Sequence, residues 1–395
     1  MNRRTFVYNA ALGTLSAGLV RLPFAQTKSR LEELRIDLHT PPVPRSPLGM
    51  PGLFPGRVVE VSHPNAIVNR RVSAPAVRAM LDAGMKTLTG ESATKDAWAR
   101  FFVPADVVAL KVNPSGVPGT VTSIPLLREV IQALATVGVP TKNMIVYDRN
   151  SNQLEVNGYH ALVPPGVRVV GLDQRWSVVG NRRSGYDPNA YCEVDCFGER
   201  ETRSYLASIV TTDATKIINL PCLKEHNASG VTGCLKNLAY GSFNNVDRTH
   251  SSPKTYTDPV ISVMCTAPAL RQKAVLNIMD GLRAVYHGGP FAWNPEFVWE
   301  AKTLLIGTDP VAVDRIELEI VEQKRRSLGV PPLADRNPAN LGSSSEMQRT
   351  AQKNAHYREP GHIKTASELG LGKWELTDIE RKKIDVSSSS RTLEP

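Results

Sequence analysis

The stretch from Leu223 to His250 gathers side chains that could do chemistry within 28 residues. It holds two lysines that could neutralise a phosphate or carboxylate, and a histidine, His226, that could transfer a proton near neutral pH. Two glycines, Gly230 and Gly233, bracket Thr232. Glycines of this kind allow an anion to approach free backbone amides closely. The stretch therefore predicts a site for a small anionic ligand with acid/base chemistry, although solvated lysines and an ordinary glycine loop are the simpler alternative.

The candidate site extends to residues that follow other strands. In open α/β sheets, ligands bind beyond the carboxyl ends of the strands. We predict His226 and Lys236 as catalytic residues and His250 as a candidate metal ligand. The predicted ligand-binding residues are Lys111, Asn113, Lys224, Gly230, Thr232, Gly233, Asn237 and Asp280.

The elements that would position these residues alternate between apolar strand patterns and amphipathic helices. Strands are predicted over 56–61, 107–112, 144–148, 168–171, 216–221, 273–279 and 303–306. Helices are predicted over 74–84, 124–137 and 310–322, with Ser73 and Asp309 as N-caps. This order predicts an α/β fold with a mostly parallel sheet, crossover helices and two lobes around a cleft.

The two ends of the chain differ from its centre. Residues 1–26 contain the pair Arg3-Arg4 followed by a short apolar run, which favours a twin-arginine signal over an amphipathic tail. That export route moves folded proteins, so we expect a periplasmic protein that meets the twin-arginine export machinery. We expect no transmembrane segment in the mature chain. The expected divisions are a proline-rich lead-in over 27–55, an α/β core over 56–330, a wrapping segment over 331–385 and a disordered tail over 386–395.

Charge and cysteine content narrow the function classes. The net charge is +9, but the basic residues are scattered and no nucleic-acid-binding signature is present, so nucleic acid is not an expected partner. The five cysteines include no Cys-x-x-Cys pair, and a cysteine-bound iron–sulfur cluster is not expected. Cys192 and Cys196 could form a disulfide, contribute to a metal site, or be two ordinary thiols. The cofactor stays open, with a metal as one candidate.

Several blocks of the sequence occur in a characteristic order. They are Ala109–Asn113, Ile218–His226, Gly230–Gly233, Leu235–Leu238, Met279–Leu282, Gly288–Pro290, Gly307–Asp314 and Gly370–Gly372. Together they resemble the signature of the domain of unknown function 362 family, over residues 55–385. The family name implies no activity. The ferredoxin-like segment that some relatives carry is not found in this sequence.

A shorter resemblance is more specific about chemistry. The order His226, Gly230, Thr232, Gly233, Lys236 is similar to a stretch of the nickel-pincer lactate racemases. The resemblance implies an acid/base role for His226, covalent attachment of the cofactor at Lys236, and nickel ligation by His250. The racemases' other catalytic histidine and their aspartate–threonine–arginine segment have no match here, which puts a shared reaction in doubt.

Two functions remain as the main hypotheses. The first is an enzyme that binds a small anionic substrate or a metal or nucleotide-like cofactor, with His226 as the acid/base. The second is a non-catalytic periplasmic protein that binds or matures an anion, a metal or a metal cofactor. A third hypothesis, a surface or nucleic-acid interaction protein, rests on net charge alone.

Overall fold

The computed structural model describes residues 31, 34–116, 119–173, 185–250, 255–334 and 360–386. The predicted signal segment, residues 1–26, lies outside this range. So do residues 335–359 of the predicted wrapping segment and 387–395 of the predicted tail. In the described part of the chain, every helix is too short or too polar to cross a membrane.

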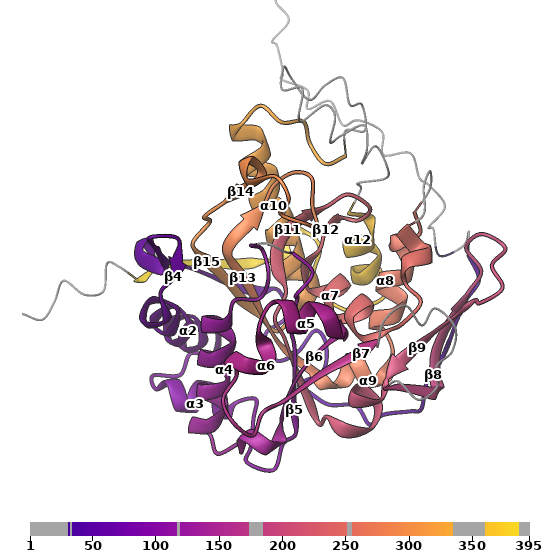
Figure 1. Ribbon diagram of the computed structural model, residues 1–395, viewed down its shortest axis with the longest axis horizontal. Helices are drawn as coiled ribbons and strands as arrows, with labels where there is room; N and C mark the ends of the chain where they lie inside the picture. The colour runs from indigo at the N-terminus through magenta and orange to yellow at the C-terminus, as the bar shows by residue number, and fades with distance from the viewer. Residues whose placement is uncertain are drawn as a thin grey trace, which may run out of the picture.

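Eleven of the described strands form one mixed sheet in which most pairs are parallel (Figure 1). Its main path runs β16 (Glu380–Asp385), β2 (Arg57–Ser62), β15 (Thr303–Gly307), β13 (Ala274–Val285), β10 (Lys216–Asn219), β5 (Val108–Lys111), β6 (Met144–Asn150), β7 (Arg168–Asp173). Three further strands are attached to it: β11 (Cys222–His226), β12 (Gly230–Val231) and β14 (Val298–Trp299). The predicted α/β class with a mostly parallel sheet is confirmed. The two-lobe arrangement is not confirmed, because strands from both ends of the described chain share this one sheet.

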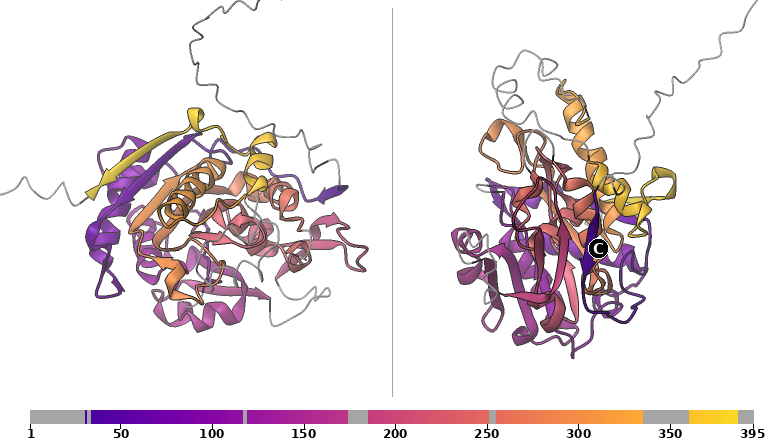
Figure 2. Two further views of the ribbon diagram at one scale, coloured as in Figure 1. Left: turned by 90° about the horizontal axis from the view of Figure 1, so that it is seen from above. Right: turned by 90° about the vertical axis from the view of Figure 1, so that its right-hand side faces the viewer.

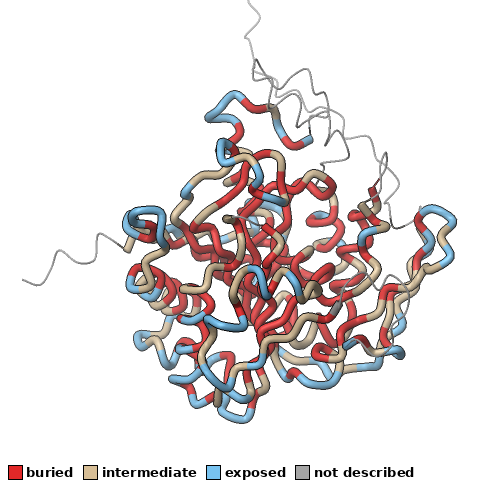
Figure 3. The backbone as a smooth tube through the Cα atoms, viewed as in Figure 1, coloured by how far each residue is buried: buried red, intermediate tan, exposed pale blue. Residues whose placement is uncertain are grey.

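Helices cover both faces of the sheet (Figure 2). One face carries α2 (Ala74–Thr89), α3 (Thr94–Ala99), α4 (Ile124–Thr136), α5 (Ser151–Val156) and α6 (Tyr159–Leu162). The other carries α7 (Gly233–Ser242), α8 (Thr257–Cys265), α9 (Pro268–Lys273), α10 (Pro310–Ser327) and α12 (Gly361–Glu368). The sheet is therefore buried on both sides, and Figure 3 shows buried backbone concentrated at its centre.

The apolar run that predicted β5 explains how Lys111 is placed. Successive strand side chains point to opposite faces. Val108 and Leu110 pack in the core beneath α2–α4, whereas Ala109 packs in the core on the α7 side. Lys111 shares the alternation of Ala109, so its side chain points toward α7.

The predicted helix starts are found where the capping residues indicated. The Ser73 hydroxyl accepts a hydrogen bond from the Ala76 amide at the start of α2. Asp309 accepts one from the Ala312 amide at the start of α10. Each cap satisfies an amide that has no partner within its own helix.

The remaining described strands and the C-terminal segment complete the fold. A three-stranded antiparallel sheet contains β1 (Ile36–His39), β8 (Tyr186–Val194) and β9 (Arg203–Ala207), and a small hairpin contains β3 (Ile67–Val68) and β4 (Arg71–Val72). Figure 2 shows β16 alongside β2 at the edge of the large sheet. α12 packs against α8. The last described strand is thus an edge strand of the large sheet, and α12 is packed onto its helical layer.

Candidate functional site

A pocket of about 570 Å³ lies at the carboxyl ends of β5 and β6. Helix α7 contributes one of its walls, and β11 and the chain around residues 288–297 contribute others. Six of the predicted site residues line it: Asn113, His226, Thr232, Lys236, Asn237 and His250. Segments that are more than 130 positions apart in the sequence are therefore brought to one cavity, at the edge of the sheet where α/β proteins bind ligands.

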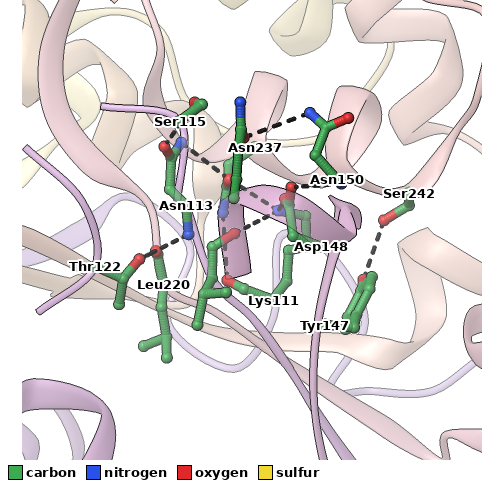
Figure 4. Close-up of polar contacts among 12 residues, drawn as sticks. Lys111, Asn113, Ser115, Thr122, Tyr147, Asp148, Asn150, Leu220, Asn237 and Ser242 are labelled. Atoms are coloured by element: carbon green, nitrogen blue, oxygen red, sulfur yellow. Dashed lines mark hydrogen bonds and ion pairs between the residues drawn. The ribbon is translucent and has the colours of Figure 1, made fainter. Parts of the chain in front are cut away.

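Lys111 lies directly behind this pocket, in a buried polar network (Figure 4). Its ammonium group donates to the Asp148 carboxylate and, at 3.1 Å, to Asn237 Oδ1. Asn113 Nδ2 donates to the same oxygen at 3.1 Å. Burial lowers the pKa of Lys111, and the charge of Asp148 opposes that shift. The network fixes the amides of Asn113 and Asn237, which line the pocket, so Lys111 acts on the pocket through them.

Gly241 shows how closely α7 and β5 approach each other. A Cβ at this position would overlap the Lys111 side chain. A larger residue at this helix position would displace the Lys111 ammonium group from its place beside Asp148 and Asn237.

Lys224 is a second fully buried lysine beside the pocket. Its ammonium group donates to Asn113 Oδ1 at 2.8 Å and approaches Ser115 Oγ at 3.5 Å. Burial lowers its pKa, because a desolvated ammonium is destabilised relative to the neutral amine. Lys224 thus orients Asn113 from behind and adds positive charge to the site.

Lys236 is the lysine that faces the cavity itself. Its ammonium nitrogen lies 5.1 Å from the centre of the Tyr240 ring. It forms no hydrogen bond or ion pair with another described residue. Burial lowers the pKa of Lys236 to about 7, with further lowering from Lys224 and Arg149 and an opposing effect of Asp247. At neutral pH a large fraction of this side chain is therefore a free amine.

The two histidines of the stretch meet at the pocket, with ring centres 5.4 Å apart. The Ala228 amide donates to His226 Nδ1 at 3.1 Å, so the proton of the neutral ring is on Nε2. His250 Nδ1 lies 3.1 Å from the Val246 carbonyl oxygen, which can only accept, so the lone pair of that ring is on Nε2. One ring can therefore donate a hydrogen bond and the other can accept one.

Both rings are neutral at physiological pH. Burial, followed by the charge of Lys236, holds the pKa of His226 well below its usual value. The same two causes, in the same order, lower the pKa of His250 to about 3. Thr232 lines the same pocket, and its hydroxyl is buried without a hydrogen-bond partner among the described residues.

The other predicted site residues lie outside the pocket lining. Gly230 has a positive φ of 77° and begins β12, where it pairs with His226 of β11. Gly233 begins α7, and a Cβ there would overlap the Asp314 carboxylate. Asp280 accepts hydrogen bonds from the Ser123 amide at 2.8 Å and the Leu282 amide at 3.0 Å, at the start of α4. These three residues shape or brace the elements around the site.

The amides that follow Gly233 are already occupied. Asp314 on α10 accepts hydrogen bonds from the Cys234 amide and, at 3.0 Å, from the Leu235 amide. Glu317 accepts one from the Lys224 amide at 2.9 Å. Burial raises the pKa of both carboxyl groups, that of Asp314 to about 7. A carboxyl group of the protein therefore takes the place that an anionic ligand could have taken at the start of α7.

Sequence reasoning missed the contribution of β6. Asp148, Arg149 and Asn150 end this strand and line the pocket, and Arg149 is paired with Asp247 at 3.2 Å. The signal was available, because β6 ends in polar residues at the same edge of the sheet as β5. Phe291 and Trp293 also line the pocket, and no pattern in the sequence pointed to them.

The described residues contain no group of three or more histidine, cysteine, aspartate or glutamate side chains that could hold a metal ion. His226 and His250 are two such side chains at the pocket. All five cysteines are free thiols, and Cys192 and Cys196 are buried. Burial raises the pKa of Cys192 to about 12 and that of Cys196 to about 11. Neither is activated as a thiolate nucleophile.

A family model described as Domain of unknown function (DUF362) matches residues 108–319, more than half of the chain. Every residue that lines the pocket falls inside the matched range. No curated protein matches the sequence.

Proposed function

This chain belongs to the DUF362 family, and from that premise we propose that it is an enzyme that binds a small organic anion and moves a proton of that ligand at Lys236. The proposal rests on one observation. Four polar groups around the pocket have no hydrogen-bond partner among the described residues: Lys236 Nζ, Thr232 Oγ1, His226 Nε2 and His250 Nε2. Thr232 Oγ1 is buried, and buried polar groups are normally satisfied. The other three atoms belong to residues that line the cavity, where a ligand can reach them. Together they indicate groups kept for a ligand.

The charges around the cavity favour an anion. Lys111, Lys224, Arg149 and Lys236 lie in or beside it, and Asp148 and Asp247 are paired with two of them. The charges of Lys224 and of protonated Lys236 remain, and a carboxylate or phosphate of the ligand can balance them. Such a ligand would also reverse part of the pKa lowering at Lys236, because an opposite charge stabilises the ammonium form.

The residues fit distinct roles in proton transfer. Lys236 is the group whose pKa lies near neutrality, so it can accept a proton and return it. His226, as a neutral ring with its proton on Nε2, can donate a hydrogen bond to a carbonyl or carboxylate oxygen of the ligand. Thr232 can bind a second oxygen. This proposal moves the acid/base role predicted for His226 to Lys236 and keeps His226 as a hydrogen-bond donor.

Proton transfer can be tested without knowing the product. A panel of 2-hydroxy and 2-oxo carboxylates is incubated with the full chain in heavy water, and loss of carbon-bound hydrogen is followed by proton NMR. We expect exchange at one or more ligands. At ligand concentrations far below saturation, its rate should rise as pH passes about 7 and Lys236 of the free protein becomes an amine. Lys236→Met should lower the rate at least 100-fold, within the range typical of a lost general base.

The control is Lys95→Met, which removes an exposed lysine on α3, across the sheet from the pocket. It should exchange like the natural chain. Exchange that survives in Lys236→Met would refute the catalytic role of Lys236.

A second candidate function is non-catalytic binding of an anion or a metal cofactor. His250 Nε2 favours it, because an unpartnered imidazole lone pair beside a second histidine is a metal-binding feature. The resemblance to nickel-pincer racemases would add Lys236 as an attachment point, but two histidines alone fall short of a full ligand set. Elemental analysis of protein purified from its own host without chelators tests this function, and near-stoichiometric metal without proton exchange would favour it.

A further inference from the structure

One wall of the pocket presents aromatic rings to solvent. Phe291 is 37% exposed and Trp293 is 73% exposed, and both line the cavity. Their ring centres are 5.6 Å apart with an angle of 36° between the planes. Large apolar side chains that stay exposed at the mouth of a pocket often mark a binding surface.

The chain that carries these rings is held against the site. Gly289 donates its amide to the buried Glu225 carboxylate at 2.6 Å, and the Asn227 amide donates to the Gly289 carbonyl at 3.4 Å. Further along the chain, after Trp293, the buried Phe297 ring packs against His287, with 4.8 Å between the ring centres. The aromatic wall is thus fastened to β11, the strand that ends in His226.

The size of the cavity also indicates a ligand that reaches the aromatic rings. Pockets of about 300–1,000 Å³ suit ligands larger than a three-carbon acid. The volume of about 570 Å³ leaves room beside Lys236 for a further part of the ligand. The exposed faces of Phe291 and Trp293 border that room.

We infer that the ligand carries a flat aromatic or heteroaromatic ring joined to its anionic group, with the ring against Trp293 and Phe291 and the anion at Lys236. This inference rests on the proposed function, because it uses the same anion site. Stacking would cover the exposed ring faces and remove water from the pocket mouth. Both an aromatic carboxylic acid and a nucleoside monophosphate have this chemistry.

The test compares two pairs of probes by calorimetry on the full chain. Adenosine 5′-monophosphate is compared with ribose 5-phosphate, and 2-naphthoate with cyclohexanecarboxylate. In at least one pair the aromatic member should bind about tenfold more tightly, or about 1.4 kcal/mol. The pair that shows this preference distinguishes the nucleotide from the aromatic acid.

Variants locate the preference. Trp293→Ala should reduce it to less than threefold, whereas Phe197→Ala, which removes a 45% exposed aromatic ring outside the pocket lining, should leave it unchanged. Equal binding within both pairs, or a preference that survives Trp293→Ala, overturns the inference.

The two proposals fail separately. Equal binding within both pairs that is lost in Lys236→Met overturns the ring inference and leaves the anion site standing. An aromatic preference that needs Trp293 but not Lys236 overturns the anion site instead. Absence of binding by all four probes contradicts both.

Discussion

Lys236 illustrates how a functional side chain can work against stability. Burial lowers its pKa from 10.5 to about 7, whereas the unfolded chain keeps the ordinary value. Between these two values the unfolded state binds more protons, so stability rises with pH across that interval. The destabilisation is complete below pH 7 and disappears as pH approaches 10.5.

Lys236→Met should therefore raise the free energy of unfolding while it lowers the rate of proton exchange. Each unit of pKa shift corresponds to about 1.4 kcal/mol, and contact with pocket solvent reduces the effect, so we expect a gain on the order of 2–4 kcal/mol at pH 7. Denaturant unfolding at pH 6, 7, 8.5 and 10 measures it. The gain should shrink steadily above pH 7, and a pH-independent gain would contradict the burial of a charge.

The types of several site residues could be predicted from the sequence, but their roles could not. Asn113, Thr232, Lys236 and Asn237 follow strands or glycines and do line the pocket. Nothing in the sequence distinguishes Lys236 from Lys111, because their difference lies in partners supplied by β6 and α7. The low pKa of His226 likewise depends on burial, which only the folded chain defines.

Among the elements, α10 holds the site together although its side chains do not line the pocket. Asp314 fixes the first amides of α7, and Glu317 fixes β11 at the Lys224 amide. The sequence predicted α10 and its Asp309 cap from Asp309-Pro310. The direction in which the Asp314 side chain points depends on how α7 and α10 pack.

Asp314→Asn should loosen the start of α7. The amide side chain keeps one acceptor oxygen but turns an N–H group toward a backbone amide, leaving a buried donor unsatisfied. We expect a loss of about 1–3 kcal/mol in the free energy of unfolding and weaker binding of anions at Lys236. Denaturant unfolding and calorimetry with the tighter aromatic probe measure the two effects.

The matched control is Glu319→Gln, on the same helix, which removes a partly exposed ion pair with Arg315. Partly exposed pairs contribute little, so its loss should stay below about 1 kcal/mol. Equal losses in the two variants would show that Asp314 is not a specific brace of α7.

At the scale of the whole molecule, local patterns predicted the order of strands along the chain better than their order in the sheet. Each strand predicted from an apolar run is present, from β2 to β15. The antiparallel placement of β13 and β15, and the pairing of β16 with β2, depend on contacts between distant segments. The stretch around Cys192 pairs as β8 with β1 and β9, and its buried residues cover the α8 side of the core.

The pocket is assembled from segments that lie far apart in the sequence, and this bears on the export route that the N-terminal arginines indicate. Its walls come from residues 113–297, across strands that pair over long sequence distances, so a ligand site exists only after folding. The twin-arginine route carries folded proteins, and we propose that Arg3 and Arg4 direct this chain along it, so that any ligand bound in the cytoplasm would cross with the protein.

Replacing both arginines with lysine keeps the charge but removes the guanidinium groups, which are not interchangeable with ammonium groups. We expect the natural chain in the periplasmic fraction and the doubly substituted chain in the cytoplasm, as measured by fractionation and immunoblotting, with Arg21→Lys exported normally as the control. Equal export of all three chains would remove the twin-arginine assignment, and a cytoplasmic natural chain would remove the periplasmic location.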